Sequence, residues 1–296
     1  MIYYYKHKSL DELSQTEIDL LGNEGIEKYA LEHNLDPKIV KTDIKNLEAE
    51  IENIAKNQFT LDSKQKIDMY NEWVNKYVTY FNTNAKHEKQ AYVLIGNIGC
   101  GKSTYAKNIE NSTNSIIIDP DRYKMGEETE RGYFGGFTEL YKKPTDRELM
   151  QELCGQATKD TLKQVAETGM NLILPKATTS QEKLEKQLDC LVKNNYDIHL
   201  ILIEAPIQDC ASRSYYRFLI REYCKSEPLK NGEYKHGRFV PVSVITNIGD
   251  GCFTTFVKSY KSSNIRYKSF KAFYNDNNKH NNNSEELDIE TMAEIY

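Results

Sequence analysis

A glycine-rich stretch between an apolar run and a run that favours a helix carries the clearest chemistry in this sequence. From Gly96 to Ser103 it fits the pattern G-x-x-x-x-G-K-[ST]. Glycine at positions 96, 99 and 101 lets the backbone turn successive N–H groups toward phosphate oxygens. Lys102 can reach the β- and γ-phosphates of a nucleotide, and Ser103 offers a hydroxyl to Mg²⁺. We therefore predict a phosphate-binding loop (P-loop) that uses ATP and Mg²⁺.

The elements around this loop fit the same prediction. Tyr92 to Ile95 is an apolar run that predicts a buried strand, and the helix expected after the loop presents its positive end to the anion. Cys100 is interpreted as a small filler, and Thr104 as a second candidate for the metal. The residues predicted to contact the nucleotide are Gly96, Asn97, Ile98, Gly99, Cys100, Gly101, Lys102, Ser103 and Thr104.

Phosphoryl transfer also needs a carboxylate for the proton of the acceptor hydroxyl and cations for the charge in transit. Asp121 follows the strand expected to neighbour the P-loop strand, so it is the candidate base, while Asp119 and Glu204 are candidates for holding Mg²⁺-bound water. Alternatively, Asp119 and Asp121 only form a turn around Pro120 and have no catalytic role. One predicted helix face carries Arg213, Arg217 and Arg221. The default interpretation of such arginines is a solvated basic stripe.

Length, charge and cysteine usage restrict the class of protein. The 296 residues have room for one α/β domain of about two hundred residues and a smaller part. With a net charge of −5, binding to nucleic acid or an anionic membrane requires a local basic patch. The six cysteines form no C-x-x-C pair, which argues against structural zinc and fits the reduced thiols of the cytoplasm. No apolar segment approaches the roughly eighteen residues of a membrane span.

Strands and helices alternate from residue 91 onward. Strands are predicted at 92–95, 115–118, 171–174, 199–203 and 265–267, and helices at 145–168, 181–194, 208–224 and after Pro241. Such alternation is typical of a parallel sheet with helices on its faces. The predicted fold class is therefore α/β, a P-loop NTPase-type parallel sheet covered by helices, with an N-terminal all-helical region. The aromatic and glycine-bearing residues 124–144 are predicted to form a substrate loop or a disordered segment.

The composition divides the chain into three regions. Residues 1–88 show helical spacing of apolar residues, so three or four helices are predicted there, one starting at Asp36-Pro37 and one over 62–80. Residues 89–275 form the predicted P-loop kinase domain, and residues 276–296 a polar, flexible tail. The helical region either shields the acceptor side as an inhibitor in cis, docks a partner, or supports the fold.

Three stretches together resemble the zeta-toxin family of P-loop kinases. They are the P-loop, the run from Ile118 to Lys124 and the string from Gly169 to Ile173, and the resemblance covers about residues 90 to 275. Members of that family transfer phosphate from ATP to the 3′-hydroxyl of the sugar in UDP-N-acetylglucosamine and related nucleotide sugars. A small helical antitoxin holds them inactive. The resemblance therefore implies a small-molecule acceptor and a helical partner.

The same resemblance implies roles for four residues. Lys102 matches the family's P-loop lysine, and Asp121 matches its base. Arg217 and Arg238 match its two lid arginines. Together with Ser103 as the metal ligand, these are the predicted catalytic residues.

The chain departs from the family where the family binds its sugar. After the third strand the family has a glutamate and a Gly-Thr-x-Arg string, whereas this chain reads Pro175-Lys176-Ala177-Thr178-Thr179. Lys159 stands where a second sugar-contacting acid is usual, and the loop between Arg217 and Arg238 is longer than usual. The resemblance thus implies ATP binding and transfer to a small molecule such as a nucleotide sugar, while the acceptor's identity stays open.

Two other functions stay open. The P-loop and the run from Asp121 to Lys124 also look like polynucleotide 5′-hydroxyl kinases, although the acidic balance of the chain offers no long phosphate track. Pro175 in place of the expected acid allows a nucleotide-dependent binding module or pseudoenzyme. Transfer of label from ATP to an oligonucleotide would select the first, and tight ATP binding without transfer would select the second.

Overall fold

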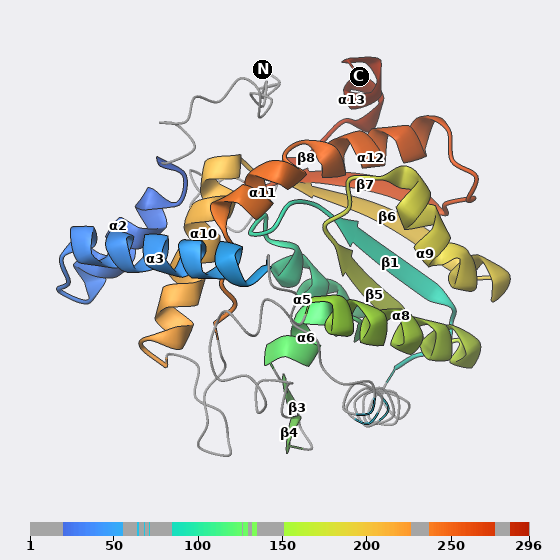
Figure 1. The fold of residues 1–296 in the computed structure, drawn as a ribbon. Coiled ribbons are helices and arrows are strands. Elements are labelled where there is room, and N and C mark those ends of the chain that lie inside the picture. Colours follow the sequence, from blue (N-terminus) through green and yellow to red (C-terminus); the bar gives the residue numbers. More distant parts are fainter. Residues whose placement is uncertain are drawn as a thin grey trace.

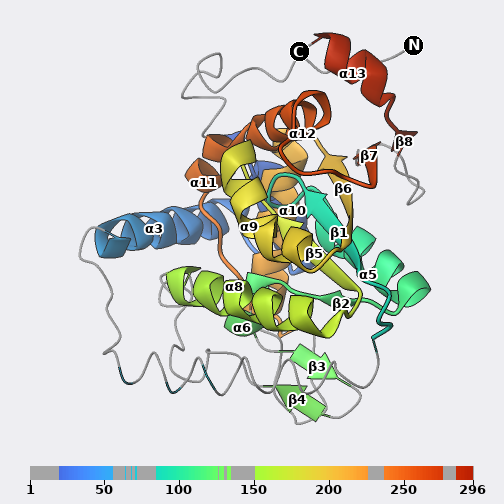
Figure 2. The same ribbon diagram turned by 90° about the vertical axis from the view of Figure 1, so that its right-hand side faces the viewer.

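The computed structural model describes residues 20–55, 64, 68, 71, 85–125, 127–129, 132–134, 151–225, 237–275 and 285–295. Its centre is a sheet with the strand order β2-β5-β1-β6-β7-β8 (Figures 1 and 2). The strands are β1 (Gln90–Ile95), β2 (Ile116–Ile117), β5 (Leu172–Lys176), β6 (Asp197–Glu204), β7 (Ser269–Tyr274) and β8 (Glu285–Glu286). The first five strands in this order pair in parallel, and β8 pairs antiparallel with β7. The predicted α/β fold with a parallel sheet is confirmed.

The strand that precedes Asp121 does not neighbour the P-loop strand. β1 pairs with β5 on one side and β6 on the other, and β2 lies beyond β5. The expectation that β2 and β1 are adjacent is therefore wrong. Strand length differs between the two: β5 has five residues and pairs on both sides, whereas β2 has only two residues and lies at the edge of the sheet, although both strands are buried on both faces.

Helices cover both faces of the sheet (Figures 1 and 2). Alternate residues of β1 point to opposite faces, so Val93 belongs to one core and Leu94 to the other. The first face packs against α8 (Gln151–Thr168), α9 (Gln181–Lys193), α12 (Gly251–Lys261) and α13 (Ile289–Ile295). The second packs against α5 (Lys102–Thr113), α10 (Ile207–Glu222) and α11 (Val242–Ile248).

Local sequence fixes where α9 begins and which face it buries. The hydroxyl of Ser180 caps the helix by accepting a hydrogen bond from the Lys183 N–H at 3.3 Å. Leu184, Leu188 and Leu191 follow at helical spacing and are fully buried against the sheet. The exposed positions of α9 are mostly polar or charged, with Val192 also exposed.

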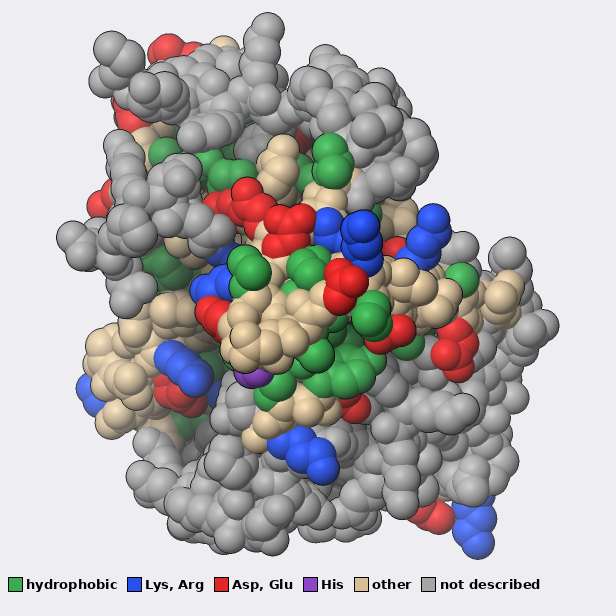
Figure 3. Space-filling view, turned by 90° about the vertical axis from the view of Figure 1, so that its left-hand side faces the viewer, with side chains coloured by type: hydrophobic (Ala, Val, Ile, Leu, Met, Phe, Trp, Pro, Cys, Tyr) green, Lys and Arg blue, Asp and Glu red, His purple; other side chains and the backbone are tan. Residues whose placement is uncertain are grey.

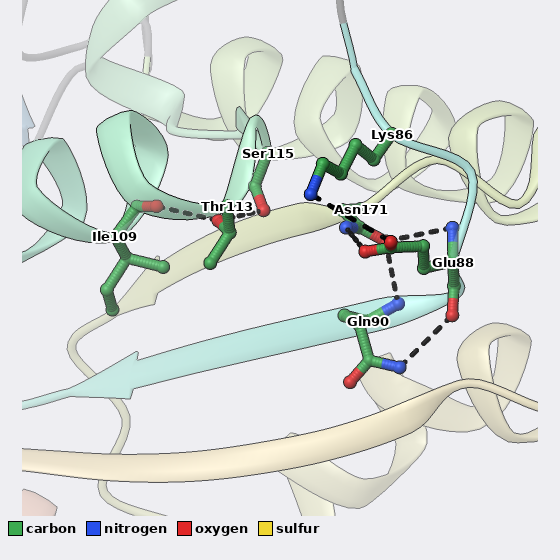
Figure 4. A network of polar contacts seen from close by, with 7 residues as sticks. All are labelled: Lys86, Glu88, Gln90, Ile109, Thr113, Ser115 and Asn171. Carbon is green, nitrogen blue, oxygen red and sulfur yellow. Dashed lines mark hydrogen bonds and ion pairs between the residues drawn. The ribbon is translucent and has the colours of Figure 1, made fainter.

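Polar contacts hold the amino-terminal edge of the sheet together (Figure 4). The side-chain oxygen of Asn171 accepts from the N–H groups of Glu88 and Gln90 at 3.1 Å each, and its amide donates to the Glu88 carboxylate at 3.0 Å. Asn171 is fully buried, so these bonds satisfy its polar atoms. The P-loop lies at the opposite edge, where the parallel strands have their carboxyl-terminal ends.

Two helices of the N-terminal region pack on α10. They are α2 (Asn23–Glu32) and α3 (Pro37–Ala55), and the predicted helix start at Asp36-Pro37 is confirmed. A Cβ at Gly25 would lie 2.1 Å from the carbonyl oxygen of Ser212, so only glycine lets α2 approach α10 this closely. Figure 3, which views the side where these helices lie, shows hydrophobic side chains among charged ones. Leu31 and Ile39 are exposed there.

Two further predictions are corrected, and part of the predicted substrate loop is described. The strand predicted at 265–267 begins later, as β7 at Ser269, and Ile265 and Tyr267 pack on the core in the segment just before it. Residues 285–295 of the predicted flexible tail form β8 and α13, since Met292 and Ala293 are buried. Within 124–144, the structure describes the end of α6 (Pro120–Met125) and a hairpin of β3 (Glu127–Thr129) and β4 (Gly132–Phe134).

Some predictions concern residues outside the described part of the chain. The helix over 62–80, the helical pattern before residue 20 and the start of the helix at 145–150 are among them. Within the described part, no helix has the length and apolar content needed to cross a membrane. All six cysteines are free thiols, as expected.

Candidate functional site

Glycine is required at two positions of the P-loop. Gly99 has φ +84°, and a Cβ there would lie 2.2 Å from the carbonyl oxygen of Cys210 on α10. Gly101 has φ +107°, and a Cβ there would lie 2.3 Å from the side-chain nitrogen of Asn275. Both positive φ values are rare for residues with side chains. The loop therefore lies tightly between the end of β1, α10 and the residue after β7.

Backbone donors of the P-loop are available to an anion. The N–H groups of Gly99, Gly101 and Ser103 have no hydrogen-bond acceptor among the residues that the structure describes. They precede or open α5, so the helix dipole adds positive potential at the same place. Unpaired N–H groups at a helix N-terminus, held by a backbone conformation that favours glycine, suit the phosphates of a nucleotide.

Hydrogen bonds hold Lys102 within the loop. Its ammonium donates to the carbonyl oxygens of Gly96 at 2.8 Å and Asn97 at 2.7 Å. The buried side chain of Asn97 donates to the carbonyl of Ile245 on α11 at 3.0 Å and accepts from the Ile98 N–H at 2.7 Å. The predicted nucleotide-binding stretch is thus one rigid turn with its cation beside the backbone donors.

Cys100, Ser103 and Thr104 complete this stretch. Cys100 is fully buried, which raises the pKa of its thiol and keeps it uncharged, as expected for a filler. Ser103 and Thr104 are exposed at the start of α5. Their hydroxyls are therefore accessible to a metal ion on the nucleotide.

Two residues outside the motif clamp the P-loop. The amide of Asn275 donates to the carbonyl of Cys100 at 2.8 Å, and the Asn275 backbone N–H donates to the Glu204 carbonyl at 2.8 Å. Arg213 on α10 donates to the carbonyls of Gly99 at 3.5 Å and Asn275 at 3.3 Å. Arg213 is therefore part of the loop's support and not a solvated stripe. Asn275 was missed by sequence reasoning, although its position directly after a strand at the carboxyl edge was a usable signal.

The carboxylate of Asp121 pairs with Arg238. The Nη1 atom of Arg238 lies 2.8 Å from both carboxylate oxygens, and both side chains are largely shielded from solvent. Asp121 lies in the first turn of α6, and its N–H donates to the carboxylate of Asp119 at 3.0 Å. Burial and the neighbouring Asp121 charge raise the pKa of Asp119. Two close carboxylates with a paired arginine thus lie at the end of β2.

Arg217 joins this group from α10. Burial lowers the pKa of its guanidinium, and so does the positive charge of Arg221, while the negative charges of Asp121 and Asp119 act in the opposite direction. Arg213 lies one helical turn before Arg217 on the same face, a rise of about 6 Å. Because Arg213 contacts the P-loop, α10 brings the P-loop and Asp121 to one side of the sheet. The predicted residues Lys102, Asp121, Arg217 and Arg238 therefore lie around one edge of the sheet.

The remaining candidates lie at the same edge. Glu204 ends β6 and is buried beside the residue that clamps the P-loop. Lys176 ends β5, and its carbonyl accepts from the Gly96 N–H at 3.2 Å. No cluster of three His, Cys, Asp or Glu side chains arranged for a metal occurs in the described ranges.

A parallel sheet with a glycine cradle, a half-buried lysine held by that loop and a carboxylate–arginine pair at its carboxyl edge defines a P-loop kinase, an ATP-dependent phosphotransferase. The family model described as zeta toxin matches residues 75–284. The chain belongs to the zeta toxin family. The resemblance stated from the sequence is confirmed, and no curated protein matches the chain.

Two solved structures are similar to the chain. One is from the PezAT chromosomal toxin-antitoxin system of Streptococcus pneumoniae, with 15% identity and a TM-score of 0.49 over 81% of this chain and 89% of that chain. The other is the AvrRxo1-ORF1:-ORF2 complex with ATP, with 10% identity and a TM-score of 0.48 over 74% of this chain. The chain spans 65% of the length of that second protein.

Proposed function

We propose that this protein transfers the γ-phosphate of ATP to a hydroxyl group of a small molecule, with a nucleotide sugar such as UDP-N-acetylglucosamine as the first candidate acceptor. One observation supports the proposal: the P-loop follows β1 and Asp121 follows β2 at the same edge of the parallel sheet, and Arg213 of α10 contacts the P-loop there. The phosphate cradle and the candidate base therefore face the same reaction volume. With ATP as the donor, we expect the protein to act in the cytoplasm.

Each residue has a role that follows from its position. The P-loop N–H groups and Lys102 would bind the β- and γ-phosphates, Ser103 would hold Mg²⁺, and Asp119 and Glu204 would lie where they can support the bound ion. When bound, Mg²⁺ offsets the negative charge of the phosphates. Asp121 accepts the proton of the acceptor hydroxyl as its oxygen forms a bond to the γ-phosphorus.

The reaction balances without any further reagent. The bond between the γ-phosphorus and the β–γ bridging oxygen breaks, and ADP leaves with that oxygen. Arg217 and Arg238 lie where they can stabilise the charge on the phosphate in transit. For this, Arg238 exchanges one of its two contacts with Asp121 for a phosphate oxygen while still orienting the carboxylate.

The acceptor can be found directly by mass spectrometry. A metabolite extract is incubated with the protein and ATP, and species heavier by one phosphate are sought, with UDP-N-acetylglucosamine as a defined substrate in parallel. The proposal predicts one phosphorylated small molecule that is absent when the Asp121→Asn variant is used. Transfer only to an oligonucleotide with a free 5′-hydroxyl would select the polynucleotide kinase instead, and ATP binding without any transfer would select the binding module.

The N-terminal helices support α10, and we propose this role for them in place of inhibition in cis. Their apolar side chains form one core with α10, which includes Ile26, Tyr29, Val40, Ile44, Tyr215 and Phe218. Because α10 carries the arginines of the site, loosening this core should lower turnover. Replacing Gly25 by alanine pushes α2 away from Ser212 and tests this, since an inhibitor in cis would instead give higher turnover. A helical antitoxin is then expected as a separate chain, as the family implies.

A further inference from the structure

A basic groove lies between α8 and α9. These helices lie side by side over β5 (Figures 1 and 2), and the groove between them has a volume of about 430 Å³. Five lysines line it: Lys159 and Lys163 from α8, Lys176 from the end of β5, and Lys183 and Lys186 from α9. This is a local concentration of positive charge on a chain whose net charge is −5.

The charge of the groove is not balanced within the described part of the protein. Asp189 is the one carboxylate in the described lining, and it pairs with Lys193 at 2.5 Å, outside the lining. Lys163 pairs with Asp160 at 3.2 Å. The other four lysines of the lining have no carboxylate within ion-pair distance among the described residues. Like charges this close repel one another, so an anion entering the groove relieves their repulsion.

Lys176 connects the groove to the reaction centre. It follows Leu172 and Leu174 on the β5 face that α8 and α9 cover, so its side chain points to the groove, while its backbone carbonyl binds the first residue of the P-loop. Burial lowers the pKa of its ammonium to about 8, the negative charge of Asp119 acts in the opposite direction, and Lys159 lowers it further. One side chain is thus within electrostatic reach of both the groove and the catalytic carboxylates.

The size and chemistry of the groove fit a phosphate group on a small molecule. Its volume is in the range of small-molecule sites. Several lysines around one space supply many N–H donors and positive charges, which match a dianionic phosphate better than a single carboxylate. A neutral sugar would leave these charges without a partner.

We propose that the groove between α8 and α9 binds a phosphate group carried by the acceptor, so that the acceptor is a phosphorylated small molecule whose hydroxyl reaches Asp121 past Lys176. This inference rests on the proposed phosphotransferase function for the identity of the ligand as acceptor. Anion binding by the groove itself does not require phosphoryl transfer.

Binding of inorganic pyrophosphate to the full-length protein, measured by calorimetry with the P-loop saturated by MgADP, tests the groove alone. We expect the wild type to bind pyrophosphate and the Lys159→Gln/Lys186→Gln variant to bind it at least about tenfold more weakly, because two charges are lost. Lys258 and Lys261 on α12 are exposed lysines outside the groove, so Lys258→Gln/Lys261→Gln is the matched control and should bind like the wild type. No binding by the wild type, or equal weakening in both variants, would overturn the proposal.

Two further measurements separate this proposal from the proposed function. The variant Lys159→Arg/Lys186→Arg keeps the charge and should restore binding; if it does not, the loss in the glutamine variant came from altered packing and the proposal falls. An acceptor found by mass spectrometry that carries no phosphate of its own would overturn the proposal while leaving the kinase activity intact. Tighter binding of a 5′-hydroxyl oligonucleotide than of pyrophosphate would overturn the small-molecule assignment.

Discussion

The donor side and the acceptor side of this protein bind anions by different means. The P-loop offers backbone N–H groups fixed by glycine conformations and by contacts with Cys210, Asn275 and Arg213. The groove between α8 and α9 offers lysine side chains on flexible stems from three elements. A rigid cradle suits a donor phosphate that must be held in one geometry, whereas mobile cations accommodate the more variable anion of an acceptor.

The comparison predicts its largest effect on the donor side. Replacing Lys102 by alanine removes the cation beside the γ-phosphate, so we expect kcat/KM for ATP to fall about 10³-fold. Steady-state kinetics measures this, with Lys107→Ala on the exposed face of the same helix as the control. Pyrophosphate binding in the groove should stay unchanged. Equal losses at both sites would show that donor and acceptor sites are not separate.

The Asp121–Arg238 pair gives the next effect. Replacing Arg238 by glutamine removes the guanidinium that holds both carboxylate oxygens and faces the phosphate in transit, so we expect kcat to fall about 10²-fold with little change in ATP affinity. Arg266 is exposed and distant in the sequence, and Arg266→Gln serves as the control. A variant that loses ATP affinity but keeps kcat would place Arg238 in nucleotide binding.

The pH dependence sharpens the comparison because, among the residues that the structure describes, the acceptor side holds the one lysine with a lowered pKa. Lys176, with a pKa of about 8, is charged below that pH and neutral above it. Raising the pH from about 7 to about 9 should therefore weaken pyrophosphate binding by up to about tenfold. Calorimetry over this range measures the effect, and Lys176→Gln should flatten the profile. An unchanged affinity across the range in the wild type would contradict it.

The smallest effect concerns the support of α10. The hydroxyl of Tyr215 donates to the Glu48 carboxylate, and both accept from the Val242 N–H. Tyr215→Phe should therefore lower the free energy of unfolding by about 1–3 kcal/mol, measured by urea denaturation. Tyr216 bonds Glu32 at the surface, so Tyr216→Phe should change it by no more than about 0.5 kcal/mol. If the two variants lower the free energy of unfolding by the same amount, the hydrogen bonds of Tyr215 do not stabilise α10.

The donor side could be predicted from the sequence because its chemistry is contiguous. Eight successive residues specify the cradle, and the strand and helix beside it have clear hydrophobic patterns. Asp121 was placed at the correct edge of the sheet even though its strand is not the neighbour of β1, because all parallel strands bring their carboxyl ends to one edge. The position of β5 between β1 and β2 depends on pairing between distant segments of the chain, which no local pattern shows.

The acceptor side could not be predicted, because its residues meet only through the packing of α8 on α9. Lys183 and Lys186 have the pattern of an ordinary exposed helix face beside Leu184. Lys159 and Lys176 were noted only as departures from the family. Asn275 was given no role from the sequence, since composition does not show that its side chain bonds the P-loop.

The central claim is that the carboxylate of Asp121 and the P-loop act on the same phosphate. The most direct test is the Asp121→Asn variant, with ATP affinity measured by calorimetry and phosphoryl transfer followed with γ-labelled ATP. The account predicts an ATP affinity within about twofold of the wild type and a loss of transfer of about 10²- to 10⁴-fold, because the asparagine side chain cannot accept the proton. Transfer at the wild-type rate would contradict the account.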